Sequence, residues 1–498
     1  SFKHLRGMFA LAIYDTLERR VTLVRDPFGI KPLYYYKSGE RVEAFSSEIK
    51  SFLKIPGFLK IVNDKAVYNY LSYQYNPLEE TFFKGVFKLP PGHFMNIDIK
   101  SGGAEIERYF NFNFSPDRTL DEEKTKKKIL KTMEDSVAHH MIADVPVGSF
   151  LSGGIDSSII ATLMQKIRGG KKIKTFTVGF SSLSEAKEAR ETSEPLGTDH
   201  TEITVTPDEY FEALPKAVWH FDEPVADPSA LGLYFLAREA RKSVKVVLSG
   251  EGSDEFFGGY NIYLAPIAAK RLAWLPESVL RFLSKLPLRG SNFATRGLLK
   301  LEDWYIGNAS IFKNEELANL WRGDEMSKAP FDIKALFKEV EGQSDSTKMQ
   351  YIDINTWLVG DILAKADKMT MAHSLELRVP FLDVEVAKLA ATLPDRFKWR
   401  RGTTKYLLRE AFASILPEST RKRKKLGFPT PVREWFTPER SWIPKLVLEN
   451  EYVKSHFNLE AVEQLFTDHF EKKTDNSRKI YLLLVLSIWY NTFIAEIT

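Results

Sequence analysis

The sequence predicts an α/β fold in which a β-rich segment precedes a parallel sheet and a mostly helical remainder. Residues 1 to about 115 contain short alternating runs bounded by Gly and Pro, which are typical of antiparallel strands. From residue 118 onward, strand-like runs alternate with amphipathic runs, which favours a parallel sheet with helices on both faces. After about residue 260 nearly every run is helical, with prolines at the breaks.

The strands of the first segment are predicted from β-branched and aromatic residues with turn signals between them. Turns are expected at Thr16–Arg19 and Ser101–Gly103. Such runs pair as antiparallel hairpins that pack one face on the rest of the protein. The predicted strands are Met8–Asp15, Arg20–Asp26, Leu33–Tyr36, Val42–Ser47 and Gly92–Ile99.

The second part begins with an amphipathic helix at Leu120–Ile142, whose first turn is acidic. Strands and helices then alternate as expected for a parallel sheet. The predicted strands are Val147–Gly153, Lys174–Phe180, Thr201–Thr206 and Val244–Gly250. The predicted helices are Ser157–Arg168, Ser184–Gly197, Asp208–Phe221 and Ser229–Ser243.

Composition narrows the classes of function. A chain of 498 residues is too long for one ordinary core, so two or three domains are expected. The formal net charge of +4 is spread along the chain, which argues against nucleic acid as a partner. Without cysteine there is no disulfide, thiolate metal site or thiol nucleophile. The apolar run Tyr481–Ile494 is short for a membrane span and predicts a buried helix, so a cytoplasmic enzyme is the expectation.

The segment FLSGGIDSS, Phe150–Ser158, lies between a predicted strand and a predicted helix. Glycines there let the backbone approach an anion, while exposed N–H groups and the helix dipole point at it. An ordinary tight turn with helix-capping residues is the simpler interpretation. The adjacent glycines, the serines and the acid Asp156 favour a phosphate site with Mg²⁺ between acid and phosphate. No Lys follows the glycines, so the segment is not a Walker A loop and better suits release of pyrophosphate.

A second glycine-rich segment, VVLSGEGSDEFFGGY, ends the strand predicted at Val244–Gly250. It carries Glu251, Asp254 and Glu255 at the carboxyl end of that strand. A solvated acidic turn is the alternative interpretation. Two such loops at one sheet edge could instead hold Mg²⁺ between Asp156 and Asp254, because Mg²⁺ takes oxygen ligands and keeps several waters.

These segments carry a family resemblance. SGGIDSS resembles the pyrophosphate loop of the N-type ATP pyrophosphatases, and SGEGSDEFFGGY resembles the corresponding segment of the glutamine-dependent asparagine synthetases. Three N-terminal segments, RDPFGIKPLYY, FSSEIKS and LPPGH, resemble the second half of their glutaminase domain. DILAKADKMTMAHSLELRVPFLD resembles their helical signature, and KKLGFPTPVREW resembles their lysine loop.

The resemblance implies an architecture and a reaction. Residues 1–115 would be the C-terminal part of an Ntn-type glutaminase domain, and residues 118–498 an ATP pyrophosphatase domain that is mostly helical after 260. The reaction would be ATP-dependent asparagine synthesis by a ligase. Aspartate would be converted to β-aspartyl-AMP with release of pyrophosphate and then amidated by ammonia, which glutamine supplies in the intact protein. The substrates would be small molecules and the cofactors ATP and Mg²⁺, with a homodimer left open.

Residue roles follow from the same resemblance. Glu251 would support formation of the acyl-adenylate and act as base when ammonia attacks, while Lys425 would meet the charge on the α-phosphate. Lys424 is the alternative to Lys425, and a solvated run of basic residues is the plainer interpretation of both. Asp156 and Asp254 would hold Mg²⁺. ATP and pyrophosphate would contact Leu151, Ser152, Gly153, Gly154, Asp156, Ser157, Ser158, Val178, Ser249 and Gly250.

Four further residues are candidates for contacts with the acceptor. Glu255, Lys365, Asp367 and Lys368 are candidates for binding the amino-acid substrate. The last three share one predicted helix, where surface ion pairing would explain them equally well.

Three other interpretations stay open. The acceptor could be another carboxylate, such as a cell-wall or natural-product precursor, with the same chemistry. An RNA-modifying enzyme would need a basic surface and usually a cysteine, and an inactive scaffold would not need intact loops.

The family's glutaminase uses an N-terminal cysteine, which the sequence lacks, so glutamine hydrolysis is not expected from these residues. The first residues resemble the middle of a domain, so a preceding segment is expected.

Overall fold

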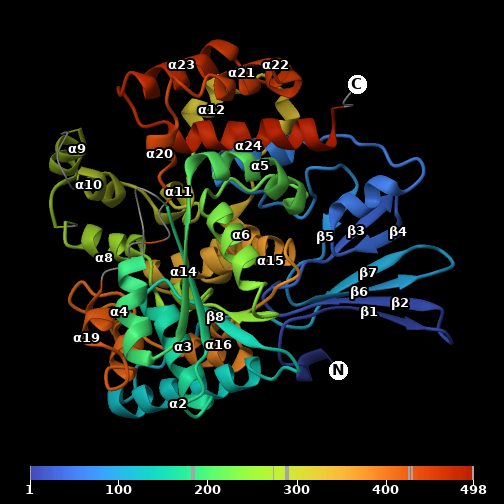
Figure 1. Ribbon diagram of the computed structural model, residues 1–498. Helices are drawn as coiled ribbons and strands as arrows, with labels where there is room; N and C mark the ends of the chain where they lie inside the picture. The colour runs from blue at the N-terminus through green and yellow to red at the C-terminus, as the bar shows by residue number, and fades with distance from the viewer. Residues whose placement is uncertain are drawn as a thin grey trace.

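The computed structural model describes residues 2–180, 186–272, 274–285, 291–423, 427 and 430–495. Its first part contains two antiparallel sheets, with strand orders β1-β2-β6-β7 and β4-β3-β5, which confirms the predicted hairpins (Figure 1). All five predicted strands are present, and β5 and β7 are additional. The strands are β1 (Ala10–Asp15), β2 (Arg20–Arg25), β3 (Tyr34–Ser38), β4 (Arg41–Ser46), β5 (Val86–Lys88), β6 (His93–Asp98) and β7 (Ala104–Arg108).

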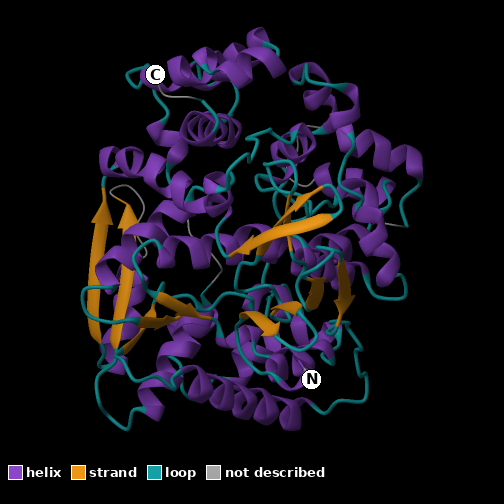
Figure 2. Ribbon diagram, turned by 90° about the vertical axis from the view of Figure 1, so that its right-hand side faces the viewer, coloured by secondary structure: helices purple, strands orange, loops and turns teal. Residues whose placement is uncertain are grey.

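The second part is organised around a five-stranded sheet in which every pairing is parallel, in the order β10-β9-β8-β11-β12. This arrangement confirms the predicted parallel sheet, and Figure 2 shows the strands of the molecule in several groups with helices around them. The sequence did not predict β12, a strand of three residues inside a helical region. The strands are β8 (Val147–Phe150), β9 (Lys174–Phe180), β10 (Asp199–Val205), β11 (Val246–Leu248) and β12 (Glu376–Arg378).

Two of the helices that accompany these strands begin at capping side chains. Asp121 accepts a hydrogen bond from the N–H of Lys124 at the start of α2, and Thr206 and Glu209 form a capping box on α5. These caps satisfy N–H groups that have no partner inside the helix. The helices are α2 (Glu122–His140), α3 (Ile155–Ile167), α4 (Ala186–Leu196), α5 (Pro207–Phe221) and α6 (Ser229–Ala240).

The remainder is helical, as predicted. The helices up to α15 are α7 (Ser253–Phe257), η3 (Asn261–Leu264), α8 (Ala265–Lys270), α9 (Glu277–Lys285), α10 (Ser291–Leu298), α11 (Leu301–Trp304), α12 (Asn314–Leu320), η4 (Glu325–Lys328), α13 (Ile333–Glu339), α14 (Asp345–Asn355), the π-helix η5 (Leu358–Leu363) and α15 (Ala364–Met371). The later helices are η6 (Pro380–Leu382), α16 (Val384–Ala391), α17 (Asp395–Lys398), α18 (Tyr406–Ala411), α19 (Glu418–Lys422), α20 (Val432–Trp435), α21 (Trp442–Glu449), α22 (Glu451–His456), α23 (Leu459–Phe470) and α24 (Ser477–Phe493).

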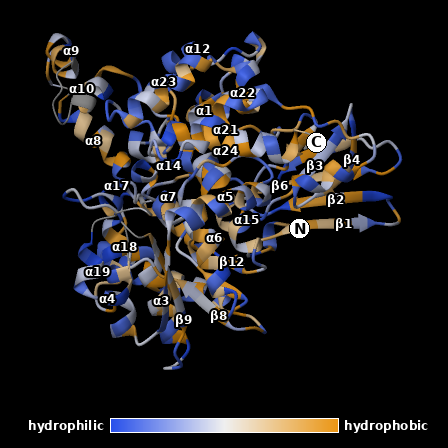
Figure 3. Cartoon of the chain, turned by 45° about the horizontal axis from the view of Figure 1, so that its top comes forward, coloured by the Kyte–Doolittle hydropathy of each residue, from blue (hydrophilic) through white to orange (hydrophobic). Residues whose placement is uncertain are grey.

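The last helix is buried on nearly all sides. Helix α24 carries the apolar run that the sequence predicted as a buried helix, and most of its side chains lie in the largest core cluster. Figure 1 shows it between α5 and the group α21–α23, and Figure 3 shows apolar residues where these helices meet. Within the described residues, no helix has both the length and the apolar character needed to cross a membrane.

A helix that the sequence did not predict, α1 (Asp64–Tyr73), lies inside the first segment and packs away from its sheets. The Tyr70 hydroxyl donates to the carbonyl of Leu482 in α24 at 2.8 Å. Phe82 and Phe83 both pack edge-on against Trp489 of the same helix. Part of the N-terminal segment therefore shares one core with the C-terminal helix.

An ionic contact joins the same parts of the chain at Asp222, which has a left-handed φ of 70°. Its buried carboxylate accepts from the ammonium groups of Lys50 and Lys368 at 2.9 and 2.7 Å. Its carbonyl accepts from the indole N–H of Trp489 at 2.8 Å. Burial alone would raise the pKa of Asp222, but the two lysines hold that pKa below its usual value.

We therefore expect Asp222→Asn to lower the free energy of unfolding by about 3–5 kcal/mol at pH 7, because two lysines lose their buried partner. The folded-state pKa lies below the unfolded one, so the carboxylate stabilises the fold above the unfolded pKa and ceases to do so as pH falls. The difference from wild type, measured by urea unfolding, should shrink toward acid pH. Asp199→Asn is the matched control, since its pair with Lys174 is exposed and should contribute less than about 1 kcal/mol. Equal effects of both substitutions would contradict this account.

Candidate active site

The first loop, residues 151–154, connects the end of β8 at Phe150 to the start of α3 at Ile155. Gly153 has a φ of +72°, and a Cβ there would lie 2.4 Å from the carbonyl of Glu188, so only glycine fits. The hydroxyls of Ser152 and Ser157 lie 3.1 Å apart and form a hydrogen bond across the loop. The loop thus places backbone N–H groups and two hydroxyls at the first turn of a helix, as an anion site requires.

The second loop follows β11, which is the direct neighbour of β8 in the parallel sheet. A Cβ on Gly250 would lie 2.8 Å from Cβ of Asp156 and 3.3 Å from the N of Ser157. The backbone of the second loop therefore rests on the first turn of α3. The structure brings the two predicted loops together at the carboxyl ends of adjacent strands.

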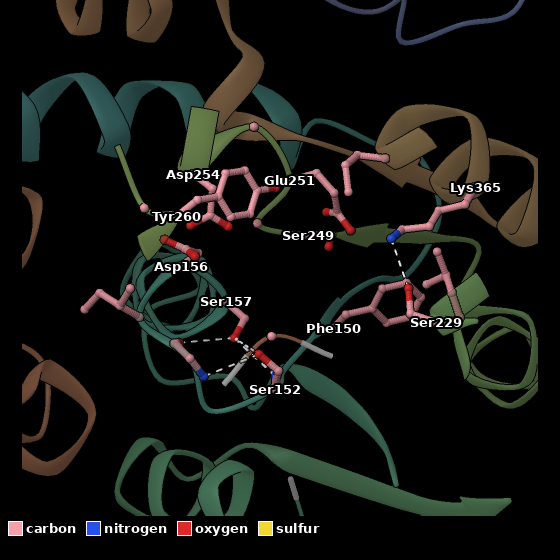
Figure 4. A pocket seen from close by; sticks show the side chains of 18 of the residues that line it. Phe150, Ser152, Asp156, Ser157, Ser229, Ser249, Glu251, Asp254, Tyr260 and Lys365 are labelled. Atoms are coloured by element: carbon pink, nitrogen blue, oxygen red, sulfur yellow. Dashed lines mark hydrogen bonds between the residues drawn. The ribbon is translucent and has the colours of Figure 1, made fainter. Parts of the chain in front are cut away.

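Both loops line a cavity of about 530 Å³. Figure 4 shows Ser152 and Ser157 on one side, Asp156 and Asp254 beside them, and Glu251 between these acids and Lys365. Gly153 and Ser158 do not line the cavity; the Ser158 side chain is buried within α3. The predicted residues that do line it are Leu151, Ser152, Gly154, Asp156, Ser157, Val178, Ser249, Gly250, Glu251, Asp254, Glu255 and Lys365.

The predicted metal-binding acids share one partner that the sequence analysis missed. The Lys405 ammonium lies 2.7 Å from both carboxylate oxygens of Asp156 and 2.6 Å from Oδ1 of Asp254. Burial alone would lower the pKa of Lys405, but the two carboxylates raise it, so the ammonium is charged. No local signal marks this lysine, because its partners lie far away in the sequence.

The donor set of Asp156 and Asp254 fits Mg²⁺, which takes one or two carboxylates together with phosphate oxygens and waters. No group of three His, Cys, Asp or Glu side chains suited to a metal occurs among the described residues.

Glu251 directly follows Ser249 and Gly250 in the second loop and faces the cavity (Figure 4). Burial raises the pKa of its carboxyl group, an effect that Ser249 and Lys365 oppose. Its Oε2 is buried and has no hydrogen-bond partner among the described residues. A carboxyl group with a raised pKa and a free oxygen at the centre of a cavity is suited to proton transfer.

Lys365 lies at the end of the cavity away from the loops. Its ammonium donates to the Asp227 carboxylate and, at 3.0 Å, to the hydroxyl of Ser229. Burial alone would lower the pKa of Lys365, but Asp227 and Asp361 raise it. Asp227 and Ser229 line the cavity and were not predicted.

Two of the four candidate acceptor residues lie elsewhere. Asp367 accepts from Lys31 at 2.8 Å, and Lys368 donates to Asp222. Both line a second cavity, of about 390 Å³, between the N-terminal sheets and the helices. Asp367 is two residues from Lys365 and therefore lies on the opposite face of α15. Lys368 is directed away from the first cavity because it pairs with Asp222. Glu255 lines the first cavity but is almost fully buried and accepts from the hydroxyl of Tyr260 at 2.7 Å.

The predicted lysines Lys424 and Lys425 lie outside the described residues. Their neighbour Arg423 donates to the carbonyl of Gly153 in the first loop at 2.5 Å. Gly427 lines the cavity, as does the buried Arg409, whose Nε donates to the carbonyl of Thr404 at 2.9 Å. The described residues on either side of the predicted lysines therefore lie beside the first loop and the cavity.

Comparison with known proteins gives two matches to family models. Residues 128–491 match the model described as asparagine synthase, and residues 1–110 match the glutamine amidotransferase domain. The chain is 44% identical to a glutamine-hydrolyzing asparagine synthetase of Bacillus subtilis over 99% of this chain and 78% of that protein. A putative glutamine-hydrolyzing asparagine synthetase of Mycobacterium tuberculosis is 42% identical over the same shares. The amidase chyE of Penicillium rubens is 27% identical over 93% of this chain and 76% of that protein.

The close approach of the two loops gives a direct test. We expect Gly250→Ala to lower the rate of ATP cleavage about 100-fold, because the new Cβ would push Asp156 and the second loop apart. Gly342→Ala is the matched control, since a Cβ there meets nothing within 4 Å. Both variants would be compared by pyrophosphate release and by thermal unfolding. Full activity of Gly250→Ala would show that the approach of the loops is not required.

Proposed function

The chain belongs to the asparagine synthase family, and on that premise we propose that it catalyses ATP-dependent synthesis of asparagine from aspartate. The observation that carries the proposal is the meeting of two glycine-rich loops around one cavity, with Glu251 at its centre (Figure 4). This arrangement suits a reaction in which pyrophosphate leaves at one end and an acyl group reacts at the other. Ammonia is the nitrogen donor, and the match to a glutamine amidotransferase model supports glutamine as its source.

At the phosphate end, the loop N–H groups and the hydroxyls of Ser152 and Ser157 would bind the β- and γ-phosphates of ATP. The backbone at Val178, Ser249 and Gly250 would contact the adenine nucleotide. Asp156 and Asp254 would hold Mg²⁺, which would neutralise charge on the departing pyrophosphate. Lys405 already bridges these two acids and would keep them in place before substrate binds.

In the first chemical step, an oxygen of the aspartate β-carboxylate would attack the α-phosphorus of ATP. The bond to the bridging oxygen of the β-phosphate breaks, pyrophosphate leaves, and β-aspartyl-AMP forms. Lys425 would stabilise the negative charge on the α-phosphate in the transition state, and one preorganised contact of this kind is worth about 3 kcal/mol. The hydrogen bond from Arg423, a described neighbour in the sequence, to the first loop supports this role.

In the second step, ammonia would attack the acyl carbon of β-aspartyl-AMP. The tetrahedral intermediate must lose a proton from nitrogen, and the bond to AMP then breaks to give asparagine. Glu251 would take that proton; the support is that its carboxyl group faces the cavity and that its raised pKa makes it a better base than an ordinary glutamate.

We further propose that residues 1–115 are part of an Ntn-type glutaminase domain and that residues 118–498 form the synthetase domain. The two antiparallel sheets of the first segment and the amidotransferase match to residues 1–110 support this division. The packing of α1 against α24 joins the two domains through a common core.

A second candidate keeps this chemistry but changes the acceptor carboxylate. Its support is the 27% identity to a protein named amidase chyE over most of both chains. Pyrophosphate release with ATP, Mg²⁺ and ammonia across a panel of carboxylic acids separates the two candidates. We expect release with aspartate, and AMP and asparagine as the accompanying products. Formation of ADP and phosphate would contradict the proposed chemistry, and release only with larger acids would favour the second candidate.

The role of Glu251 predicts a pH dependence. Its carboxyl must be ionised to accept a proton, and burial raises its pKa, so asparagine formation should be lost on acidification at a pH above the ordinary value for glutamate, about 4.3. Glu251→Gln should lower asparagine formation about 10²- to 10⁴-fold and abolish this acid limb. Rates would be compared at a fixed concentration of free ammonia. Glu239→Gln in α6, whose partner is the exposed Lys242, is the control. Retention of both rate and acid limb in Glu251→Gln would exclude the role.

A further inference from the structure

The cavity has five cationic side chains in its described lining, and four of them are already engaged. Lys405 pairs with Asp156 and Asp254, and Lys365 pairs with Asp227 and lies 3.7 Å from Asp361. Arg409 and Arg423 donate to backbone carbonyls, and Arg423 also pairs with Glu191. The fifth cation is Arg478.

Arg478 lies in the first turn of α24, and its side chain is solvent-exposed at the rim of the cavity. Its guanidinium donates to Oε1 of Gln74 at 2.8 Å. Across the residues that the structure describes, it has no carboxylate partner. Four of its five N–H donors therefore remain available for a planar anion such as a carboxylate.

Gln74 fixes the position of this guanidinium. It follows α1, is almost fully buried, and has a left-handed φ of 60°. The side-chain Nε2 of Gln74 donates to the Asp361 carboxyl group at 2.8 Å. The main-chain carbonyl of Gln74 accepts from the N–H of Ala226, also at 2.8 Å. Because the amide nitrogen is held by Asp361, the amide oxygen is directed toward Arg478.

The α-carboxylate of the acceptor requires a cation at the end of the cavity that lies away from the two loops. Aspartate has two carboxylates, and only the β-carboxylate reacts. The reacting carboxylate must lie beside the nucleotide, near Glu251 and the two loops. The α-carboxylate then lies farther from the phosphates, where a cation with free donors would both bind it and exclude the reversed orientation.

We propose that Arg478, positioned by Gln74 of the N-terminal segment, binds the α-carboxylate of the aspartate acceptor. This inference rests on the proposed function. It makes the N-terminal segment part of the acceptor site, and it makes the enzyme select α-amino acids over acids that lack an α-carboxylate.

The test compares aspartate with 3-aminopropanoate, which is aspartate without its α-carboxylate, in the pyrophosphate-release assay with ATP, Mg²⁺ and ammonia. We expect Arg478→Ala to raise KM for aspartate about 10- to 100-fold, as for loss of a hydrogen-bonded charge. KM for ATP and kcat/KM for 3-aminopropanoate should not change, and Arg478→Lys should recover part of the loss. Lys479→Ala is the matched control, because the neighbouring side chain pairs with Glu316 and does not line the cavity.

A second variant tests the part played by Gln74. Gln74→Glu would place a carboxylate against the guanidinium and compete with the substrate, so KM for aspartate should again rise while KM for ATP stays constant. An unchanged KM for aspartate in Arg478→Ala would overturn the proposal, as would a rise in KM for ATP or an equal loss with both acceptors. The wild-type enzyme separates this outcome from failure of the proposed function, which would appear as no asparagine from aspartate before any substitution is made.

Discussion

The active cavity depends on one close approach, in which the backbone of Gly250 rests on the first turn of α3 at Asp156. Strands β8 and β11 are parallel neighbours, so their loops emerge at the same sheet edge. The approach gives a continuous surface of N–H groups and hydroxyls, but it also brings Asp156 and Asp254 within reach of a single ammonium group. Two carboxylates so close repel one another unless a cation lies between them.

Lys405 supplies that cation. The backbone at Lys405 and at Gly259 adopts a form that leaves room for the lysine side chain. Lys405 has a left-handed φ of 55°, which costs an ordinary residue about 1–2 kcal/mol. A Cβ on Gly259 would lie 2.1 Å from Cε of Lys405, so a larger residue there would displace the lysine. Two carboxylates and one ammonium leave the site net negative. Mg²⁺ at the same pair would make it net positive, which is the sign that attracts a nucleotide.

The sequence was sufficient to predict the residues that lie in local motifs. The two loops, their acids and the parallel sheet could be predicted because glycines, serines and strand periodicity occur together in short segments. Lys405 and Arg478 could not, because neither lies in a recognisable motif and the partners of each lie more than a hundred residues away. Helix α1 was missed within a segment rich in strand signals. Asp367 and Lys368 were grouped with Lys365 by helical proximity, although the structure turns them toward Lys31 and Asp222.

The proposed acceptor end of the cavity differs from the proposed phosphate end in the parts of the chain that form it. The phosphate end comes mainly from two loops of one sheet, whereas Gln74 and Arg478 are separated by 404 residues. Their contact exists only because α1 leaves the antiparallel sheets and packs on α24, with Tyr70 bonded to Leu482 and Trp489 bonded to Asp222. The same packing brings Lys50 of the N-terminal segment and Lys368 of α15 to the buried carboxylate of Asp222. The proposed acceptor end therefore depends on contacts between the N-terminal segment and α24.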